Sequence, residues 1–330
     1  MRALVTGASG MLGRHTVAVL SEAGVTVRAY ARQSSNVDHL PCPPNELVRG
    51  DAENVAAMAR AVRGVDVVFH LAGYLTVSAP FGAGDGQALA QYRTVNVAFT
   101  EHLLAAALDE GVSRFLFASS NSVYDPAAPA PTPEEGPLGP ISDYGRSKLA
   151  AEERVRTYQQ RGLATTIVRP PVIYGPGDRY FTPAALRLAQ MPLLPLVNGG
   201  RALFDVVYVR DVARLLWQAA RAGAAVGRVY NAGPGRPTTL ADVVAAYRKL
   251  MGGGPRIVAL SPRAALRLRH VTRPLLRLLA PGMEAVMTPQ GIDLMSRDMH
   301  LDTGRAARAR GFRPQYTVLA GLRETLREVG

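Results

Sequence analysis

Cysteine and long apolar runs are scarce in this chain of 330 residues, and each scarcity excludes a class of protein. The only cysteine is Cys42, which excludes an internal disulfide framework and favours a reducing compartment. No stretch approaches the roughly 20 apolar residues of a membrane span. The apolar run that follows Met1 is too short for a signal peptide. We therefore expect a globular protein located in the cytoplasm.

Lysine is scarce relative to the total positive charge. Of 38 basic residues only Lys148 and Lys249 are lysines, and the other 36 are arginines. The formal net charge is +12, but the arginines are spread along the chain without a basic block interleaved with aromatic residues. We therefore expect no nucleic-acid partner. We also assign no metal site.

Lys148 closes the segment Tyr-Gly-Arg-Ser-Lys that begins at Tyr144. Two residues four positions apart lie on one face of a helix. A phenol titrates near pH 10, and a neighbouring ammonium stabilises the phenolate, which makes the tyrosine a usable general acid or base. This spacing alone also fits a solvated helix face, so other features must support the catalytic interpretation.

A glycine-rich segment follows the first predicted strand, residues 2–6. Gly7, Gly10 and Gly13 precede a helical pattern over residues 14–23. Such glycines allow a tight turn and a close approach of backbone to a pyrophosphate, which the helix N-terminus binds through unpaired N–H groups. We therefore predict a dinucleotide cofactor here, with Ser9, Met11 and Leu12 among its contacts.

The second predicted strand, residues 25–31, bears on the choice of cofactor. NAD-binding proteins usually carry an acid near the end of this strand to bind the ribose, but no acid occurs between Val25 and Val37. Arg28 and Arg32 lie in this window, and Arg32 is placed to pair with a 2′-phosphate. We predict NADP, with NAD as the alternative.

Strand and helix patterns alternate through the first half of the chain, which predicts an α/β fold with a doubly wound parallel sheet of the Rossmann type. We assign residues 1–170, joined by about 203–232, to this domain. A smaller, mainly helical substrate lobe comprises residues 171–202 and 233–330. Residues 78–91 read as a mobile loop, and His70 as a satisfied core histidine.

Arginine and leucine alternate over residues 262–285, around Pro274 and Pro281. One interpretation is a basic amphipathic surface that touches lipid without spanning it. The other, which we favour at this point, is a set of helices that close the substrate lobe with their arginines in water.

Taken together, these motifs occur in the order found in the extended short-chain dehydrogenase/reductase superfamily, also called the NAD-dependent epimerase/dehydratase family. In character the chain is most similar to the branch of 3β-hydroxysteroid dehydrogenases and dihydroflavonol reductases. The resemblance rests on the following segments: residues 6–13, 51, 70–73, 96, 119–124, 144–148, 169–170, 174–176 and 302–314.

This resemblance implies roles for individual residues. Ser120 would orient the substrate oxygen, Tyr144 would move its proton, and Lys148 would lower the tyrosine pKa and bind the nicotinamide ribose. Asp51 would contact adenine, and Asn96 would fix the backbone behind the site. The remaining implied cofactor contacts are Ala52, Leu71, Ala72, Gly73, Pro170 and Val172.

Two departures from the family bear on the substrate. Nucleotide-sugar members usually have an asparagine where this chain has Val172, and an arginine where it has Phe204. A diphosphate placed against valine and phenylalanine would lose charge-assisted hydrogen bonds. We therefore predict an NADP(H)-dependent dehydrogenase or ketone reductase with a largely apolar substrate.

Two other functions stay open. One is a nucleotide-sugar epimerase or dehydratase with tightly bound NAD, and the other is a non-catalytic NADP sensor. The family resemblance also implies a homodimer formed through the helices near residues 94–110 and 145–161.

Overall fold

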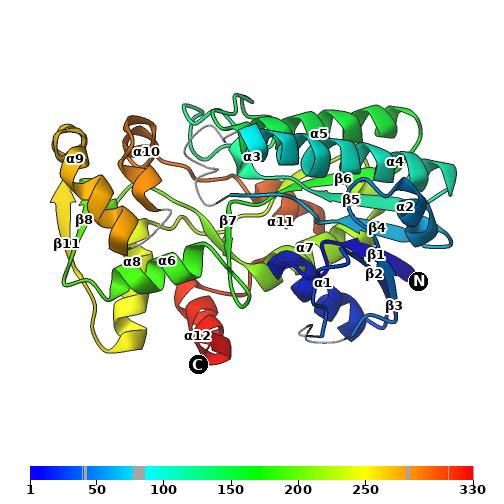
Figure 1. The fold of residues 1–330 in the computed structure, drawn as a ribbon, viewed down its shortest axis with the longest axis horizontal. Helices are drawn as coiled ribbons and strands as arrows, with labels where there is room; N and C mark the ends of the chain where they lie inside the picture. Colours follow the sequence, from blue (N-terminus) through cyan, green and yellow to red (C-terminus); the bar gives the residue numbers. More distant parts are fainter. Residues whose placement is uncertain (39, 41–42, 77–85, 280–282, 311, 330) are drawn as a thin grey trace.

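A seven-stranded parallel sheet lies at the centre of one half of the molecule (Figure 1). The computed structural model describes residues 1–38, 40, 43–76, 86–279, 283–310 and 312–329, so Cys42, Pro281 and most of the predicted 78–91 loop lie outside the described residues. The sheet order is β3-β2-β1-β4-β5-β6-β10. Its strands are β1 (Arg2–Thr6), β2 (Thr26–Ala31), β3 (Glu46–Arg49), β4 (Val67–His70), β5 (Arg114–Ala118), β6 (Thr165–Arg169) and β10 (Val229–Asn231). The predicted Rossmann-type sheet is confirmed.

Helices cover both faces of this sheet because its strands are apolar on both sides. Successive side chains of a strand point to opposite faces, so Ala3 and Val5 pack into one core cluster and Leu4 into the other. Helices α1 (Met11–Glu22) and α7 (Val209–Ala220) cover the first face. Helices α2 (Val55–Val62), α4 (Phe99–Asp109) and α5 (Asp143–Gln160) cover the second, above the sheet in Figure 1.

The other half of the molecule contains two small parallel sheets as well as helices. Strand β7 (Val172–Tyr174) pairs with β9 (Val206–Tyr208), and β8 (Leu193–Val197) pairs with β11 (Arg256–Leu260). The helices of this half are α6 (Phe181–Ala189), α8 (Leu240–Met251), α9 (Pro262–Leu279), α10 (Pro289–Leu294) and α12 (Val318–Val329), while α11 (Gly304–Arg310) returns to β10. Short 3₁₀ segments are η3 (Asn121–Val123), η4 (Asn198–Gly200), η5 (Gly223–Ala225) and η6 (Met283–Met287). The assignment of residues to two domains stays a prediction.

Several local features differ from the sequence expectations. Residues 86–91, expected in a loop, form the helix α3 (Gly86–Gln91), and the helix expected from about Thr94 begins as the π-helical segment η2 (Tyr92–Ala98). Helix α9 continues past Pro274 to Leu279, so this proline does not end the helix. Within the described residues, no helix combines the length and apolarity needed to cross a bilayer.

A buried ion pair fastens α5 to the sheet. Arg169 at the end of β6 donates from Nε and Nη2 to the two carboxylate oxygens of Glu152, at 2.8 and 2.6 Å. The Arg169 side chain is 1% exposed and the Glu152 side chain is 0% exposed. Arg169 also donates to the Glu134 carbonyl at 3.0 Å, so the loop between η3 and α5 depends on the same guanidinium.

We expect Glu152→Gln to destabilise the protein by about 3–5 kcal/mol, because it leaves the buried Arg169 cation without its counter-charge. Glu153→Gln is the matched control, since Glu153 is the next residue on α5 but is exposed. Chemical denaturation of both variants measures the difference. A Glu152→Gln protein as stable as Glu153→Gln would contradict this account of the pair.

Candidate active site

The glycine loop between β1 and α1 fits tightly against the end of β4. Gly7 has φ of +68°, and a Cβ added there would lie 2.8 Å from the Ala72 backbone. A Cβ on Gly13 would lie 2.0 Å from the Gly7 carbonyl oxygen, so only glycine permits α1 to start this close to the strand. Helix α1 begins without a side-chain cap and without an acid in its first turn. Its first N–H groups are therefore available to an anion such as a pyrophosphate.

Ser9, Met11 and Leu12 lie half-buried on this loop and on the first turn of α1, and Gly10 is exposed. They share an edge of the sheet with Leu71, Ala72 and Gly73, which directly follow β4. Thr6 helps to bind the two segments together, because its hydroxyl accepts from the N–H groups of Leu71 and Ala72 at 3.3 Å.

His70 is a core residue with both ring nitrogens satisfied. Its Nδ1 lies 2.7 Å from the Thr6 hydroxyl and its Nε2 lies 2.8 Å from the Thr100 hydroxyl. Thr100 donates its own proton to the Asn96 carbonyl, which assigns the imidazole proton to Nε2. Burial lowers the pKa of His70 to about 3, so the ring stays neutral.

The end of the site expected to bind adenosine is formed by the turns that follow β2 and β3. Tyr30 donates to the Asp51 carbonyl at 2.7 Å, which positions exposed Asp51 and half-buried Ala52 at this edge. The Arg32 side chain is exposed, and Arg49 donates to the Arg32 carbonyl at 2.8 Å. Arg28 is turned away into an ion pair with Glu46 at 2.5 Å, so Arg32 alone of the two reaches solvent here.

Asn96 joins the loop after β4 to α5. Its Oδ1 accepts from the Tyr74 N–H at 2.7 Å, and its Nδ2 donates to the Tyr74 carbonyl at 3.1 Å and to the Ser147 hydroxyl at 2.9 Å. Ser147 in turn donates to the Tyr144 carbonyl at 2.7 Å. Asn96 lies in the π-helical η2, and such segments often occur at functional sites. No hydrophobic period in the sequence marked this π-helix.

Ser120 and Tyr144 meet because α5 begins very close to η3. Ser142 caps α5 by accepting from the Gly145 N–H at 3.1 Å. A Cβ on Gly145 would lie 2.3 Å from the Ser122 carbonyl oxygen, so glycine within Tyr144–Lys148 permits the contact. The Ser120 hydroxyl accepts from the Ser122 N–H at 3.1 Å, donates to the Ser122 hydroxyl at 3.2 Å, and lies near enough to the Tyr144 phenol to influence its pKa. The role of Gly145 was not evident from the sequence.

Burial is the largest cause of the pKa shifts of Tyr144 and Lys148. It raises the pKa of Tyr144 to about 12, against a smaller lowering by the Ser120 hydrogen bond. The predicted lowering of this pKa by Lys148 is therefore wrong, because desolvation sets the direction of the shift and Lys148 is not among its causes. Burial also lowers the pKa of Lys148 to about 7, with Glu152 opposing the shift.

The Lys148 ammonium is poised for a ligand. Its side chain is buried, and Nζ lies 4.2 Å from the centre of the Phe117 ring. Within the described part of the chain, no carboxylate or carbonyl forms a hydrogen bond or ion pair with it. A Cβ on Gly73 would lie 4.0 Å from Lys148 Nζ, so the ammonium faces the end of β4 where the resemblance places the cofactor. The open α1 terminus, the glycine contacts and this ammonium fit a nicotinamide dinucleotide.

An apolar cluster lies beside the site, at the two positions where the resemblance predicts polar groups for nucleotide-sugar members. Val172 and Phe204 pack in one cluster with Phe181, whose ring lies 6.5 Å from that of Phe204. Phe204 also lines a small apolar cavity of about 40 Å³. Its other lining residues include Leu196, Val197, Leu260, Met287, Leu294 and Arg297, all from the lobe. Pro170, just after β6, contacts the segment after β5, because its carbonyl accepts from the Asn121 N–H of η3 at 2.9 Å.

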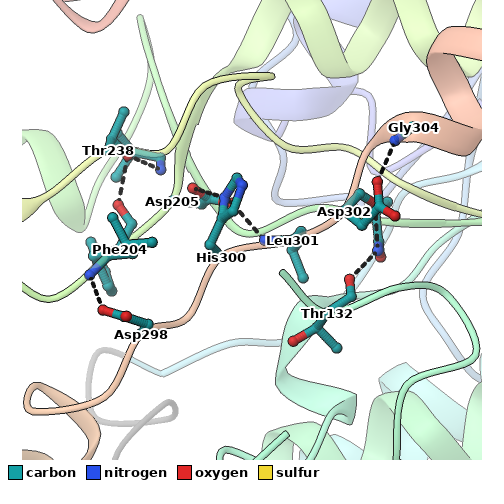
Figure 2. Close-up of polar contacts among 12 residues, drawn as sticks. Thr132, Phe204, Asp205, Thr238, Asp298, His300, Leu301, Asp302 and Gly304 are labelled. Carbon is teal, nitrogen blue, oxygen red and sulfur yellow. Dashed lines mark hydrogen bonds and ion pairs between the residues drawn. The ribbon is translucent and has the colours of Figure 1, made fainter. Parts of the chain in front are cut away.

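Hydrogen bonds join residues 298–304 to Asp205, just before β9, and to the loop that carries Thr132 (Figure 2). The buried Asp205 carboxylate accepts from His300 Nδ1 and from the Leu301 N–H, each at 2.9 Å. The bond to Asp205 raises the pKa of His300. On the other side, the Thr132 N–H donates to the His300 carbonyl at 2.8 Å. No pattern in the sequence predicted this Asp205–His300 pair.

Comparison with known proteins agrees with this geometry. The model of the NAD dependent epimerase/dehydratase family matches residues 3–233. A 4-hydroxy-2-methyl-3-oxo-4-farnesyl-3,4-dihydroquinoline-1-oxide ketoreductase of Stigmatella aurantiaca is 28% identical, over 100% of this chain and 97% of that protein. A 2-alkyl-3-oxoalkanoate reductase of Stenotrophomonas maltophilia is 30% identical, over 98% of each chain. A solved UDP-glucose 4-epimerase of Thermotoga maritima superimposes with a TM-score of 0.77 at 26% identity, over 100% of this chain and 98% of that chain.

We expect Lys148→Met to stabilise the cofactor-free protein below neutral pH. The native pKa of Lys148 is about 7, below its ordinary value of 10.5, so the unfolded chain binds the proton more tightly than the native state. Stability therefore rises as pH increases from 7 toward 10.5, and the buried charge destabilises the native state below pH 7. The gain should be on the order of a few kcal/mol at pH 6 and should vanish near pH 10.5.

Denaturant unfolding at several pH values measures this effect. Lys249→Met is the matched control, because Lys249 is the only other lysine and is exposed. A stability difference between Lys148→Met and the wild type that does not change with pH would show that the ammonium is not strained by burial.

Proposed function

Because this chain belongs to the NAD-dependent epimerase/dehydratase family, an NAD(P)-dependent enzyme family, we propose that it is an NADP(H)-dependent dehydrogenase or ketone reductase with a largely apolar substrate. The observation that carries the substrate class is the apolar cluster of Val172, Phe181 and Phe204, of which Phe204 also lines the lobe cavity. A diphosphate would find no charged donor in that cluster. An alkyl or isoprenoid group would instead bury apolar surface there.

In this proposal the cofactor, when bound, would supply a hydride to the carbonyl carbon in reduction or accept one from the alcohol carbon in oxidation. Ser120 donates a hydrogen bond to the substrate oxygen and orients it beside the Tyr144 phenol. Tyr144 gives its proton to that oxygen during reduction and takes it back during oxidation. With its pKa raised to about 12, the phenol is protonated at neutral pH, which is the form that reduction needs.

Lys148 holds the nicotinamide ribose in this proposal and supports the phenolate during turnover. Ligand hydroxyls would give its ammonium the acceptors that the described residues do not provide. Two named relatives also support a ketone substrate, since one is a ketoreductase of a farnesylated quinoline and the other reduces 2-alkyl-3-oxoalkanoates.

A nucleotide-sugar epimerase with tightly bound NAD is the second candidate, favoured by the overlap with UDP-glucose 4-epimerase. Arg297 lines the lobe cavity and could meet a phosphate. However, Arg297 is paired with Asp293 at 2.9 Å, which reduces the charge available to a diphosphate.

For the cofactor, Arg32 supports NADP over NAD. It is exposed at the end of β2, in a window without acids, while Arg28 is occupied by Glu46. The turn that carries Arg32 is fixed because Arg49 donates to the carbonyls of Arg32 and Ser35 at 2.8 and 2.6 Å.

We expect Tyr144→Phe to lower kcat by about 10²–10⁴-fold in NADPH-dependent reduction of an apolar ketone, while cofactor affinity is retained. Tyr158→Phe is the control, because Tyr158 is a buried tyrosine on the same helix. The assay uses cofactor-stripped protein with apolar ketones, β-keto acids and hydroxysteroids, and UDP-sugars in parallel. Interconversion of a UDP-sugar without net NADPH consumption would refute the reductase and establish the epimerase.

We expect Arg32→Ala to raise the KM for NADPH by about 10–100-fold and to leave the KM for NADH unchanged, because only NADPH loses a charge-assisted hydrogen bond. Arg63→Ala provides the comparison, since its side chain is also exposed but lies on the turn after α2. Equal effects on both cofactors would mean that Arg32 does not read the 2′-phosphate.

A further inference from the structure

Helix α9 carries an apolar stripe that faces away from the protein. Leu268, Val271, Leu275 and Leu278 are spaced by three, four and three residues, so they lie on one side of the helix. Their exposed fractions are 44%, 70%, 47% and 79%. Isolated exposed hydrophobic residues are ordinary, but a continuous stripe on one helix marks an interaction surface.

A different face of α9 attaches the helix to the lobe. Ala265 is fully buried, and Leu266 and Leu276 pack against the core clusters beneath the helix. The exposed stripe is therefore not needed for folding of the lobe. It is a second apolar face, left in water.

Positive charge borders this stripe on one side, where Arg263 and Arg267 lie, and the other arginines of the helix lie away from the stripe. Residues 262–279 contain five arginines, at positions 263, 267, 269, 273 and 277, together with His270, and no aspartate or glutamate. Within the part of the chain that the structure describes, a single ion pair involves these arginines, between Arg277 and Glu284 at 3.7 Å. Among the described residues, Arg263, Arg267 and Arg273 have no acidic partner.

Helix α9 lies at one end of the molecule. Figure 1 shows α9 at the end of the long axis opposite the β1–β3 edge of the large sheet. On its inner side, the cluster beneath α9 includes Val197, Leu260 and Met287, which also line the lobe cavity.

We propose that α9 docks this protein on the surface of an anionic lipid bilayer. The apolar stripe would enter the boundary between headgroups and acyl chains, and the arginines would contact lipid phosphates. A second copy of this chain is a poorer partner, because facing α9 helices would bring five arginines against five. A nucleic acid would match the charge but would leave the apolar stripe in water.

This docking does not depend on the proposed reaction. If that reaction is also correct, docking brings the apolar cavity next to the membrane phase that holds apolar substrates. The two proposals are tested separately, since vesicle binding is measured without turnover.

The test is cosedimentation of the full-length protein with phosphatidylcholine vesicles, with and without phosphatidylglycerol. We expect binding that requires phosphatidylglycerol and weakens as salt is added. Val271→Ser with Leu278→Ser should abolish binding. Arg263→Gln with Arg267→Gln, which border the stripe, should weaken it on the order of tenfold or more.

Matched controls remove equivalent groups elsewhere. Val55→Ser with Leu138→Ser deletes two side chains that are 49% and 42% exposed outside α9, and Arg63→Gln with Arg228→Gln removes two exposed arginines. Both control proteins should bind as the wild type does. Absence of vesicle binding, binding unaffected by the α9 variants, or a concentration-dependent dimer that those variants dissociate would overturn the proposal.

Discussion

The ion pair between Arg169 and Glu152 is the constraint on which the active site depends. It joins the end of β6 to the third turn of α5, and both side chains are removed from water. Two desolvated charges are tolerated only with good geometry and further hydrogen bonds, which Glu134 and Arg156 supply. Tyr144 and Lys148 lie on the same helix, so their positions relative to β5 and β6 follow from this pair. Glu152 also lies one turn beyond Lys148, and its charge opposes the lowering of the Lys148 pKa by burial.

Close backbone approach is the second constraint. Gly7, Gly13 and Gly145 lie where an added Cβ would overlap a neighbouring backbone atom. The first two bring the start of α1 against the ends of β1 and β4, and the third brings the start of α5 against η3. Both helix starts therefore converge on one edge of the sheet, where ligands of open α/β sheets bind. In the proposed function, the loop would bind the cofactor phosphates and the start of α5 would carry the tyrosine that transfers a proton.

Surface chemistry separates the two halves of the molecule. The half with the large sheet has an exposed edge suited to a polar cofactor, while the lobe offers an apolar cavity and an outward apolar stripe on α9. The stripe changes the interpretation of residues 262–285. We had favoured helices that merely close the lobe with their arginines in water. The exposure of Val271 and Leu278 now favours lipid contact, because those residues are not used to close the lobe.

Periodicity and spacing within single elements were enough to predict the parallel sheet, the glycine loop and the shared helix face of Tyr144 and Lys148. The grouping of Ser120 with them was predicted from the family resemblance, because Ser120 lies on a different element. Arg169 could be noticed as a motif, but its burial against Glu152 could not, since that contact joins residues 17 positions apart on different elements. The π-helical turn around Asn96, the Asp205–His300 pair and the net rise in the pKa of Tyr144 were likewise decided by tertiary structure. All three depend on contacts between segments that are far apart in the sequence. Such contacts, and the burial that they cause, exist only once the chain has folded.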